Sequence, residues 1–294
     1  MATQKRKRST RRKRTKSKSG RKLFSICMAL LLVAIALLAV PHYYSSIKAA
    51  INSISLSPEA GNMPSDSSVA DLMEVKAPEE LSEQFVEYKG FSVSFNPKLR
   101  IPNYVVYELT KQEATGDEAR AKSFDCDNDV EGCPQPFDYT RSGYDRGHMA
   151  PAGDMKWDYD AMHESFYMTN ICPQKHALNG GGWKRLEEKV RDWAERDSAI
   201  IVITGPITSP GMSTIGPGIA VPPSFFKVLL APFAKPMRGI AFIYKNEGGQ
   251  KVIEKQAVSI DSVERATGFD FFYNLPDNLE NKIESSSNYK EWNN

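Results

Sequence analysis

The chain has 294 residues, of which 41% are hydrophobic and 25% are charged, a composition that excludes a disordered or fibrous protein and is typical of a globular one. The net charge of +2 hides an asymmetry, because residues 1–22 contain twelve lysines and arginines and no acid, whereas the remainder carries 26 basic against 36 acidic residues. The four cysteines include no C-x-x-C pair, so a structural zinc site is not expected.

Residues 23–40 form an uncharged run of 18 residues in which Ser25 is the one polar side chain. This length is at the lower end of what spans a bilayer. Pro41 ends the run, and aromatic residues follow it, as they do at a membrane interface. Because basic residues favour the cytoplasmic side, we expect a cytoplasmic tail at 1–22 and a transmembrane signal anchor at 23–40, with the rest of the chain periplasmic or extracellular.

Two other interpretations of this segment stay open. A cleaved signal peptide has the same basic and apolar regions, although no small-x-small cleavage site follows the run. A mitochondrial presequence with an anchor is also compatible, because residues 1–22 are basic, contain Ser and Thr, and lack acid. The alternatives to a membrane-anchored protein are therefore a secreted protein and one in the mitochondrial intermembrane space.

Residues 41–80 predict a flexible linker, since the stretch from Ser53 to Ser68 is rich in Ser, Pro, Gly and Asn and shows little periodicity. We expect one globular domain over residues 81–294. Within it, Cys126 and Cys133 lie in loop-like sequence. They are a candidate disulfide if the compartment is oxidising, and two free thiols are the alternative.

Several segments of the domain predict strands, because apolar and β-branched residues alternate or run together in them. The run from Ala199 to Thr204 ends at Gly205-Pro206 and predicts a central strand. The other expected strands cover residues 91–95, 104–109, 225–230 and 240–244.

The clearest helix is expected from about Asn179 to Arg196. Its apolar residues recur at spacings of three and four, and Asn179 is a plausible N-cap. A second helix is expected from Ser259 to Thr267. Strands outnumber helices and do not alternate strictly with them, which favours an α+β domain on a central, mainly antiparallel sheet.

The most informative motif is Asp145-Arg146-Gly147-His148. A guanidinium beside an imidazole disfavours its charged form, so His148 is suited to accept a proton. An arginine at this place can also hold an anion within reach of that base. A base and an anion clamp are two of the requirements for cleaving a phosphodiester.

A second set of polar residues lies in the segment from Asn170 to Glu188. Asn179 and Glu187 are eight positions apart on the expected helix, which places them within roughly 80° of each other around its axis. Both side chains are therefore expected to face one cleft, about two turns apart.

Together with Ala150-Pro151-Ala152, the motif at residues 145–148 resembles the signature of the DNA/RNA non-specific endonucleases, the family of Serratia nuclease and mitochondrial endonuclease G. Further segments match in order, and the resemblance covers roughly residues 88–275. These segments are Arg120 with Ser123-Phe124-Asp125, Ser142-Gly143-Tyr144, Phe166-Tyr167-Met168-Thr169-Asn170 with Pro173-Gln174, and Asn179-x-Gly181-x-Trp183-x-x-Leu186-Glu187.

This resemblance implies a ββα-metal (His-Me finger) nuclease fold and Mg²⁺-dependent hydrolysis of DNA and RNA to 5′-phosphorylated products. Mn²⁺ is a candidate substitute for Mg²⁺. The roles that it implies are a general base at His148, a metal ligand at Asn179, a holder of metal-bound water at Glu187, phosphate contacts at Arg120 and Arg146, and a positioning residue at Asn170.

The chemistry of these residue types is compatible with those roles. Mg²⁺ prefers oxygen ligands and keeps several waters, so one Asn carbonyl is a sufficient protein ligand when phosphate oxygens add to it. Contacts from a metal and from arginines to backbone phosphates predict little sequence specificity. In an acidic domain the substrate needs a local basic patch, for which the candidates are Arg120, Arg146, Lys175, Lys184 and Arg185.

The expected partners are DNA and RNA substrates and, through residues 23–40, a membrane. No organic cofactor is expected, and the oligomeric state stays open, with a homodimer as one candidate. Asp145 is expected to be structural, bonded to backbone or to a neighbouring arginine, and His176 is expected at the surface. The alternative function is a catalytically silent nucleic-acid-binding or adhesion domain, against which the intact set of His148, Asn179 and Glu187 argues.

Overall fold

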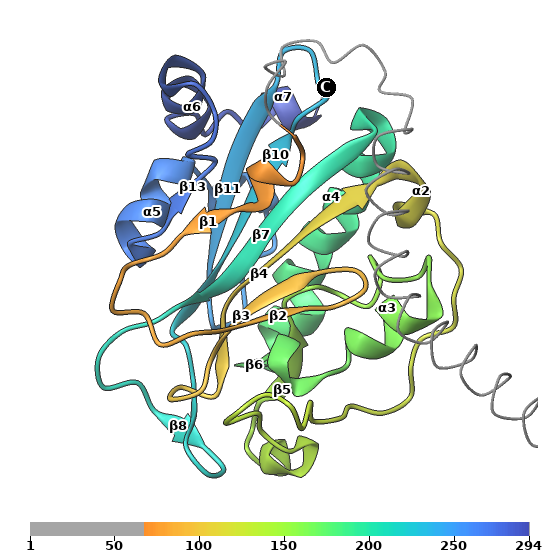
Figure 1. Ribbon diagram of the computed structural model, residues 1–294, viewed down its shortest axis with the longest axis vertical. Coiled ribbons are helices and arrows are strands. Elements are labelled where there is room, and N and C mark those ends of the chain that lie inside the picture. Colours follow the sequence, from red (N-terminus) through yellow and green to blue (C-terminus); the bar gives the residue numbers. More distant parts are fainter. Residues whose placement is uncertain (1–67, 294) are drawn as a thin grey trace, which may run out of the picture. The chain divides into compact units, whose positions relative to one another are not determined.

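Alternating apolar residues build a seven-stranded antiparallel sheet in the computed structural model, which describes residues 68–293 (Figure 1). Neighbouring strands pair in antiparallel register throughout this sheet. In spatial order the strands are β12 (Ala257–Val258), β11 (Arg238–Lys245), β10 (Ser224–Ala231), β7 (Ala199–Ile207), β4 (Ile101–Thr110), β3 (Ser92–Asn96) and β2 (Gln84–Glu87).

The five expected strands and the mainly antiparallel sheet are confirmed. Strand β7 is the central strand, with β4 on one side and β10 on the other. Its residues from Ala199 to Thr204 are all buried, because the sheet is covered on both faces. This explains why the segment is continuously apolar instead of alternating.

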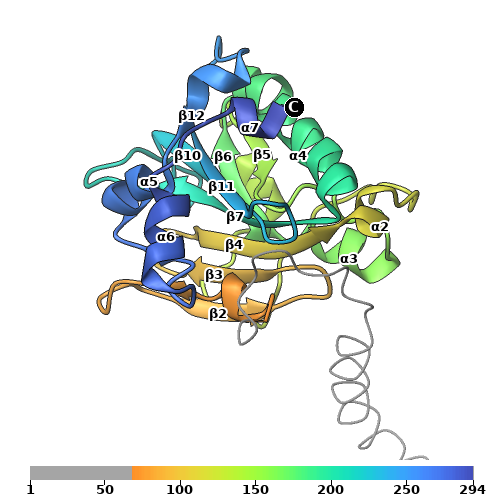
Figure 2. The ribbon, with the colours of Figure 1, turned by 90° about the horizontal axis from the view of Figure 1, so that it is seen from above.

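Each face of the sheet has its own apolar core (Figure 2). Helix α4 (Lys184–Asp197) covers one face with Leu186, Val190 and Trp193, all of which are fully buried. Helices α5 (Ile260–Thr267) and α6 (Asp277–Glu284) cover the other face. Burying a large apolar side chain stabilises the fold by about 1.5–3 kcal/mol, so these two layers hold the sheet rigid beneath the helices.

The predicted ββα unit lies on the α4 face of the sheet. Strand β5 (Asp145–His148) pairs in antiparallel register with β6 (Ile171–Gln174), so that His148 lies opposite Ile171. A turn of irregular helix, η4 (Leu178–Trp183), then leads into α4. The long connection between the two strands contains α3 (Tyr159–Glu164), capped by Asp158, and the 3-10 turn η3 (Met168–Asn170).

Several short elements complete the described part of the chain. The helices are α2 (Lys111–Ala114) and α7 (Lys290–Asn293), and the 3-10 turns are η1 (Asp71–Met73), η2 (Pro136–Tyr139) and η5 (Ile253–Gln256). Two small strand pairs are β1 (Val75–Lys76) with β13 (Asp270–Phe271), and β8 (Thr214–Ile215) with β9 (Ile219–Ala220).

The expected linker at 41–80 ends earlier than the composition suggested. Leu72 is fully buried in the core beneath α5, and β1 pairs with β13. Asn274 also donates a hydrogen bond to the carbonyl oxygen of Asp71 at 2.9 Å. The folded domain therefore begins before residue 81. The polar composition of this segment did not indicate it, because few of its residues are apolar and pack on the domain.

The expected tail at 1–22 and the expected anchor at 23–40 lie outside the described residues. Within residues 68–293, no helix has the length and apolarity needed to cross a membrane. Cys126 and Cys133 are buried free thiols, so the expected disulfide is not formed. The Sγ of Cys126 lies 3.5 Å from the carbonyl oxygen of Cys133, to which it donates as a thiol.

Candidate active site

One cavity of about 360 Å³ collects five of the six predicted site residues. It opens where the end of β5, the turn η4 and the first turns of α4 meet the loop around residue 120. Its polar lining consists of His148, Asn179 and Glu187 together with the basic side chains of Arg120, Arg146, Lys184 and Arg191. Segments that are up to 71 positions apart in the sequence thus meet at one place, which combines an imidazole, an amide, a carboxylate and cationic side chains.

His148 is held as a neutral imidazole. Its side chain is 8% exposed and packs against the rings of Phe124 and Phe166, with ring-centroid distances of 5.2 and 4.9 Å. Burial, and then the charge of Arg120, lowers the pKa of His148 to about 3. The sequence suggested a neutral imidazole, but it named Arg146 as the cause, whereas desolvation is the larger one and Arg120 is the cation. Nε2 of His148 is buried and has no hydrogen-bond partner within residues 68–293.

Asn179 is oriented by Asp145. The Nδ2 of Asn179 donates to Oδ2 of Asp145 at 3.0 Å. Because an ionised carboxylate only accepts hydrogen bonds, the amide NH₂ must face Asp145, and the carbonyl oxygen Oδ1 is left available to another partner. Nδ1 of His176 lies 2.9 Å from the same carboxylate oxygen, although the imidazole is largely exposed, as expected. Asp145 therefore has a structural role, but toward these two side chains and not toward an arginine or the backbone.

The helix expected to begin at Asn179 begins at Lys184. Gly181 has non-helical backbone angles (φ −114°, ψ −110°), so the chain kinks within η4, between Asn179 and the start of α4. Asn179 is consequently not the N-cap of α4, whose N-cap is Trp183 without a side-chain hydrogen bond. The prediction that Asn179 and Glu187 lie on one regular helix is wrong. The kinked turn nevertheless brings both residues to the cavity wall.

Glu187 lies above a buried set of charged residues. Burial raises the pKa of its carboxyl, and the nearby Lys227 ammonium opposes that rise. Lys227 is 1% exposed, and its Nζ lies 4.8 Å from the centroid of the Trp183 ring. This Nζ has no hydrogen-bond partner in the described part of the chain. Burial lowers the pKa of Lys227, and the Glu187 carboxylate is the main influence that raises it. Each group therefore stabilises the charged form of the other in a poorly solvated place.

A second buried pair fixes Arg191 beside Glu187. The Nη1 of Arg191 donates to Oδ1 of Asp154 at 2.7 Å, and the hydroxyl of Tyr107 donates to Oδ2 at 2.7 Å. Asp154 is 1% exposed, so this charge-assisted contact holds the guanidinium at the cavity wall. Sequence reasoning missed Arg191, Asp154 and Lys227. Arg191 had a usable signal, because it follows Glu187 by four positions on the same helix.

The two predicted phosphate-binding arginines are both stacked on aromatic rings. The guanidinium carbon of Arg120 lies 4.9 Å from the Phe166 ring centroid, and that of Arg146 lies 5.3 Å from the Phe124 centroid. Arg146 also donates from Nε to the carbonyl oxygen of Pro136 at 3.1 Å. The rings restrict the positions of the guanidinium groups, which reduces the entropy lost when they bind an anion.

Asn170 is not in the cavity. It is fully buried, and its side chain donates to the carbonyl oxygens of Ala150 (2.9 Å) and Ser165 (2.8 Å) and accepts from the amide of Ala150 (2.8 Å). The backbone amide of Met149, next to His148, also donates to the carbonyl of Asn170. Asn170 thus supports the end of β5 and does not touch the reacting groups.

The expected basic patch is only partly formed. Arg120, Arg146 and Lys184 line the cavity, whereas Lys175 and Arg185 do not. The Nζ of Lys175 instead lies 3.9 Å from the Tyr144 ring centroid. With Arg191, four cationic side chains and the carboxylate of Glu187 line the cavity, so it is locally basic within a domain of acidic composition.

Gly147 is required by close packing between the two strands of the ββα unit. A Cβ at this position would collide with the side chain of Gln174, which is fully buried on β6. A larger residue would push β5 away from β6 and displace His148, which follows Gly147 directly.

The strand pair β5–β6 followed by α4 is the ββα arrangement that the sequence predicted. The sequence model of the DNA/RNA non-specific endonucleases matches residues 68–278, so the chain belongs to that family of metal-dependent enzymes acting on phosphodiester bonds. The match includes the segment around Leu72, which agrees with a folded domain that begins before residue 81.

Among similar proteins, the mitochondrial nuclease EXOG of Homo sapiens is 34% identical over 64% of this chain and 56% of its own length. The mitochondrial nuclease of Saccharomyces cerevisiae is 33% identical over 63% of this chain and 64% of its own length. The chain thus spans less than two thirds of the length of these relatives. Of solved structures, endonuclease G in its complex with the inhibitor EndoGI matches 73% of this chain and 95% of its own with a TM-score of 0.64 and 27% identity.

Proposed function

We propose that the chain is a divalent-metal-dependent endonuclease that hydrolyses DNA and RNA without regard to base sequence. The observation that carries the proposal is the convergence of His148, Asn179 and Glu187 on one cavity with four cationic side chains. The cavity offers positive charge to a phosphate, and contacts to backbone phosphates carry no information about base sequence. The names of the relatives as nucleases support the same reaction class.

The residues present suit a magnesium ion. Asn179 presents a neutral carbonyl oxygen, because its NH₂ is engaged by Asp145, and Glu187 contributes a carboxylate to the same cavity. Oxygen donors in small number are what Mg²⁺ takes in proteins, since it keeps most of its own waters. When bound, the ion would neutralise charge on the phosphate and on the leaving oxygen.

The side chains of the chain itself supply the other requirements. His148 is neutral at physiological pH and can take the proton of the attacking water, although its low pKa limits how strongly it holds that proton. The forked guanidinium groups of Arg120 and Arg146 can follow the charge that builds on the phosphoryl oxygens. Glu187 orients water at the cavity, and the Asp154–Arg191 pair restricts how far its wall can move.

We also propose a cellular location for the domain, based on residues 1–40. A basic tail followed by an apolar run favours a membrane-anchored enzyme with its domain on the far side of the membrane. The relatives named as mitochondrial nucleases favour the mitochondrial alternative. Fractionation of cells that express the full chain with a C-terminal tag, followed by carbonate extraction, separates the anchored form from a released one.

Digestion of plasmid DNA and of a long RNA by the purified full chain tests the function. We expect cleavage of both substrates with Mg²⁺, none with excess chelator, and a loss of at least about 100-fold in rate for His148→Ala. His163→Ala, at an imidazole on α3 outside the cavity, is the matched control and is expected to keep its rate. Binding of both nucleic acids without metal-dependent cleavage would instead establish the silent binding domain.

A further inference from the structure

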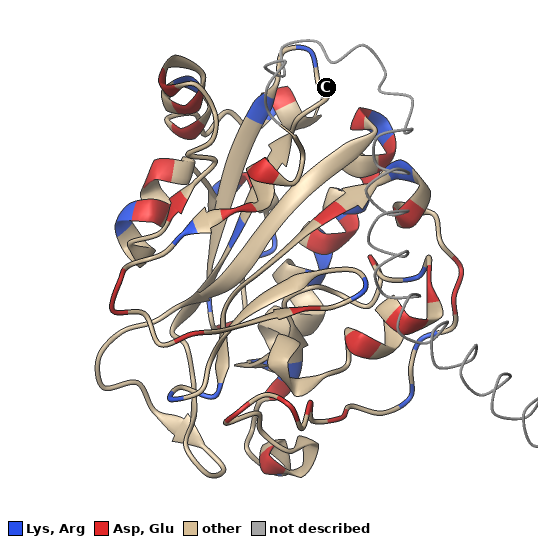
Figure 3. Ribbon diagram, viewed as in Figure 1, with Lys and Arg blue, Asp and Glu red and all other residues tan. Residues whose placement is uncertain are grey.

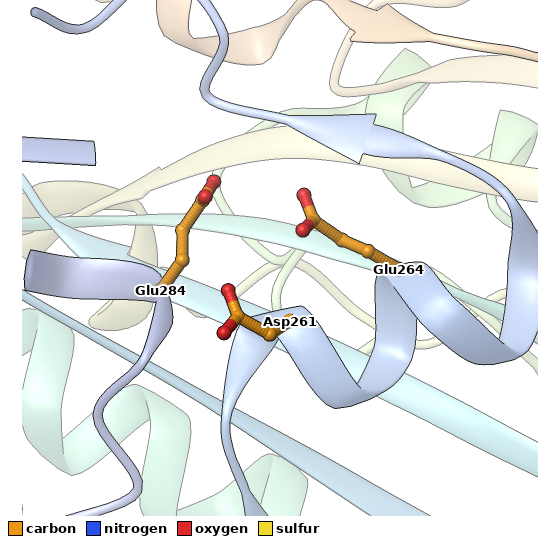
Figure 4. Close-up of side chains that lie close together, drawn as sticks. All are labelled: Asp261, Glu264 and Glu284. Carbon is orange, nitrogen blue, oxygen red and sulfur yellow. The ribbon is translucent and has the colours of Figure 1, made fainter. Parts of the chain in front are cut away.

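Three carboxylates converge on the face of the sheet opposite the candidate active site. Asp261 and Glu264 lie on α5, and Glu284 is the last residue of α6. One carboxylate oxygen from each lies within 4.8 Å of the others, and Figure 4 shows the three side chains turned toward a common point. Figure 3 shows that acidic residues recur on α5 and α6.

Glu284 is the residue that a chance cluster of surface acids does not explain. It is 5% exposed, and its Oε1 is buried with no hydrogen-bond partner among the described residues. A buried carboxylate that lacks a donor is costly, and acids in proteins are almost never buried without a partner. Its nearest charged neighbours in the cluster, Asp261 and Glu264, are also acids and offer no hydrogen-bond donor to this oxygen.

Among residues 68–293, the one ion pair that involves these three carboxylates is formed by Arg265 with Asp261. Arg265 approaches Asp261 at 3.9 Å with both side chains solvated, which is a weak interaction. Glu264 accepts one hydrogen bond, from the backbone amide of Phe271 at 2.9 Å. Neither contact reaches the free oxygen of Glu284, so the three carboxylates lack a counter-charge at their centre.

We infer that Asp261, Glu264 and Glu284 form a calcium site that joins α6 to α5. Oxygens bound to one Ca²⁺ at about 2.3–2.6 Å can lie up to roughly 5 Å apart, which matches the spacing of this cluster. Ca²⁺ suits it better than Mg²⁺, because Ca²⁺ accepts irregular sets of mono- and bidentate carboxylates whereas Mg²⁺ demands near-ideal octahedral geometry. Water completes the coordination on the side where Asp261 is solvated.

The site would act on the fold and not on the reaction. Helices α5 and α6 both pack on β11, and Ile283 beside Glu284 enters the same core as Ile260 and Val263. A cation at this place removes the repulsion between the two helix ends and holds the final turn of α6 on the sheet. Figure 2 shows α5 and α6 on the face of the sheet opposite α4. The active-site cavity is lined by residues of α4, so loading of the calcium site is independent of the proposed nuclease metal.

Calorimetric titration of the chelator-stripped full chain with CaCl₂ tests the inference, in an Asn179→Ala background that removes the proposed active-site ligand. We expect one Ca²⁺ per chain with a dissociation constant between about 10⁻⁵ and 10⁻³ M and a higher melting temperature when Ca²⁺ is bound. Glu284→Gln, which keeps the shape of the side chain, should weaken binding at least about tenfold and abolish the calcium-induced rise in melting temperature.

Asp261→Asn provides a second variant, because Asp261 is partly exposed and its loss does not disturb the core. It should weaken calcium binding as well, whereas Asp277→Asn, at an exposed acid on the first turn of α6, should leave it unchanged. Absence of saturable Ca²⁺ binding, or equal affinity in Asp261→Asn, would overturn the site. Neither outcome depends on whether the chain cleaves nucleic acid.

Discussion

Asp145 and Asn179 are 34 positions apart in the sequence, and their side chains form one hydrogen bond of 3.0 Å. It joins the first residue of β5 to the turn η4, so it fixes both the relative position of the ββα elements and the rotamer of the amide. The proposed metal ligand is thus oriented by a residue that does not itself need to touch the metal.

We expect Asp145→Asn to weaken activation by Mg²⁺ by about 10- to 100-fold, because a neutral amide no longer forces the NH₂ of Asn179 toward itself. The rate at saturating Mg²⁺ should fall less than the metal affinity. The measurement is cleavage rate against Mg²⁺ concentration. His176→Ala, which removes the other side chain on the same carboxylate, is the control and should shift the Mg²⁺ dependence only slightly. Unchanged metal activation in Asp145→Asn would contradict the orienting role.

The sequence predicted the residue types of the site but not contacts such as the one between Asp145 and Asn179. The residue types of the motif predicted a base, an oxygen ligand and an anion clamp, and the structure places them in one cavity. The contacts between them could not be predicted, because they join distant segments whose relative position depends on the kink at Gly181. Gly182 beside it has no room for a Cβ, which would collide with the backbone of Gln250.

Lys227 offers a test of the buried charges beneath the site. Lys227→Met keeps most of the apolar stem and removes the ammonium that supports the charged form of Glu187. We expect the Mg²⁺ concentration for half-maximal activity to rise about tenfold, which corresponds to about 1.36 kcal/mol in metal binding. The reason is that a neutral Glu187 orients water poorly. Lys245→Met, at an exposed lysine on β11, is the matched control. A Lys227→Met enzyme with wild-type Mg²⁺ dependence would show that the ammonium is only a packing feature.

Lys227 also illustrates the limits of strand prediction. The expected strands were found because β-branched and apolar residues mark them, and the central place of β7 followed from its continuous apolar run. A single lysine in β10 gave no sign of burial on its own. Its position did carry information, because Lys227 lies on the same face of β10 as Phe225 and Leu229, which belong to the core beneath α4. The start of the folded domain before residue 81 was missed, since Leu72 is one apolar residue in polar sequence.

Asn170 is expected to be a positioning residue whose loss affects stability first. Asn170→Ala leaves the amide and the carbonyl of Ala150 without their partners in a buried place, which costs about 1–3 kcal/mol for each unsatisfied group. We expect the free energy of unfolding in urea to fall by about 3 kcal/mol. Ser142→Ala, whose hydroxyl bonds only within its own turn, is the control. A wild-type unfolding free energy together with lost activity would instead indicate direct participation in the reaction.

The low pKa of His148 predicts a specific dependence of stability on pH. Its folded-state pKa is about 3, below the unfolded value of 6.5, so the unfolded chain binds more protons between those two values. This contribution is fully present above pH 6.5 and is lost as the pH falls toward 3. Between pH 6.5 and pH 5 it should lower the free energy of unfolding by about 2 kcal/mol, at 1.36 kcal/mol per pH unit.

His148→Gln isolates this effect, because glutamine has a similar size and does not titrate. The difference in unfolding free energy between the wild type and His148→Gln, measured in urea at several pH values, should change by about 2 kcal/mol in favour of the variant from pH 6.5 to pH 5. Every other titrating group is common to both proteins and cancels to first order. If the difference in unfolding free energy stays constant across this range, His148 takes up its proton equally in the folded and the unfolded chain. That result would contradict a His148 imidazole that burial keeps neutral.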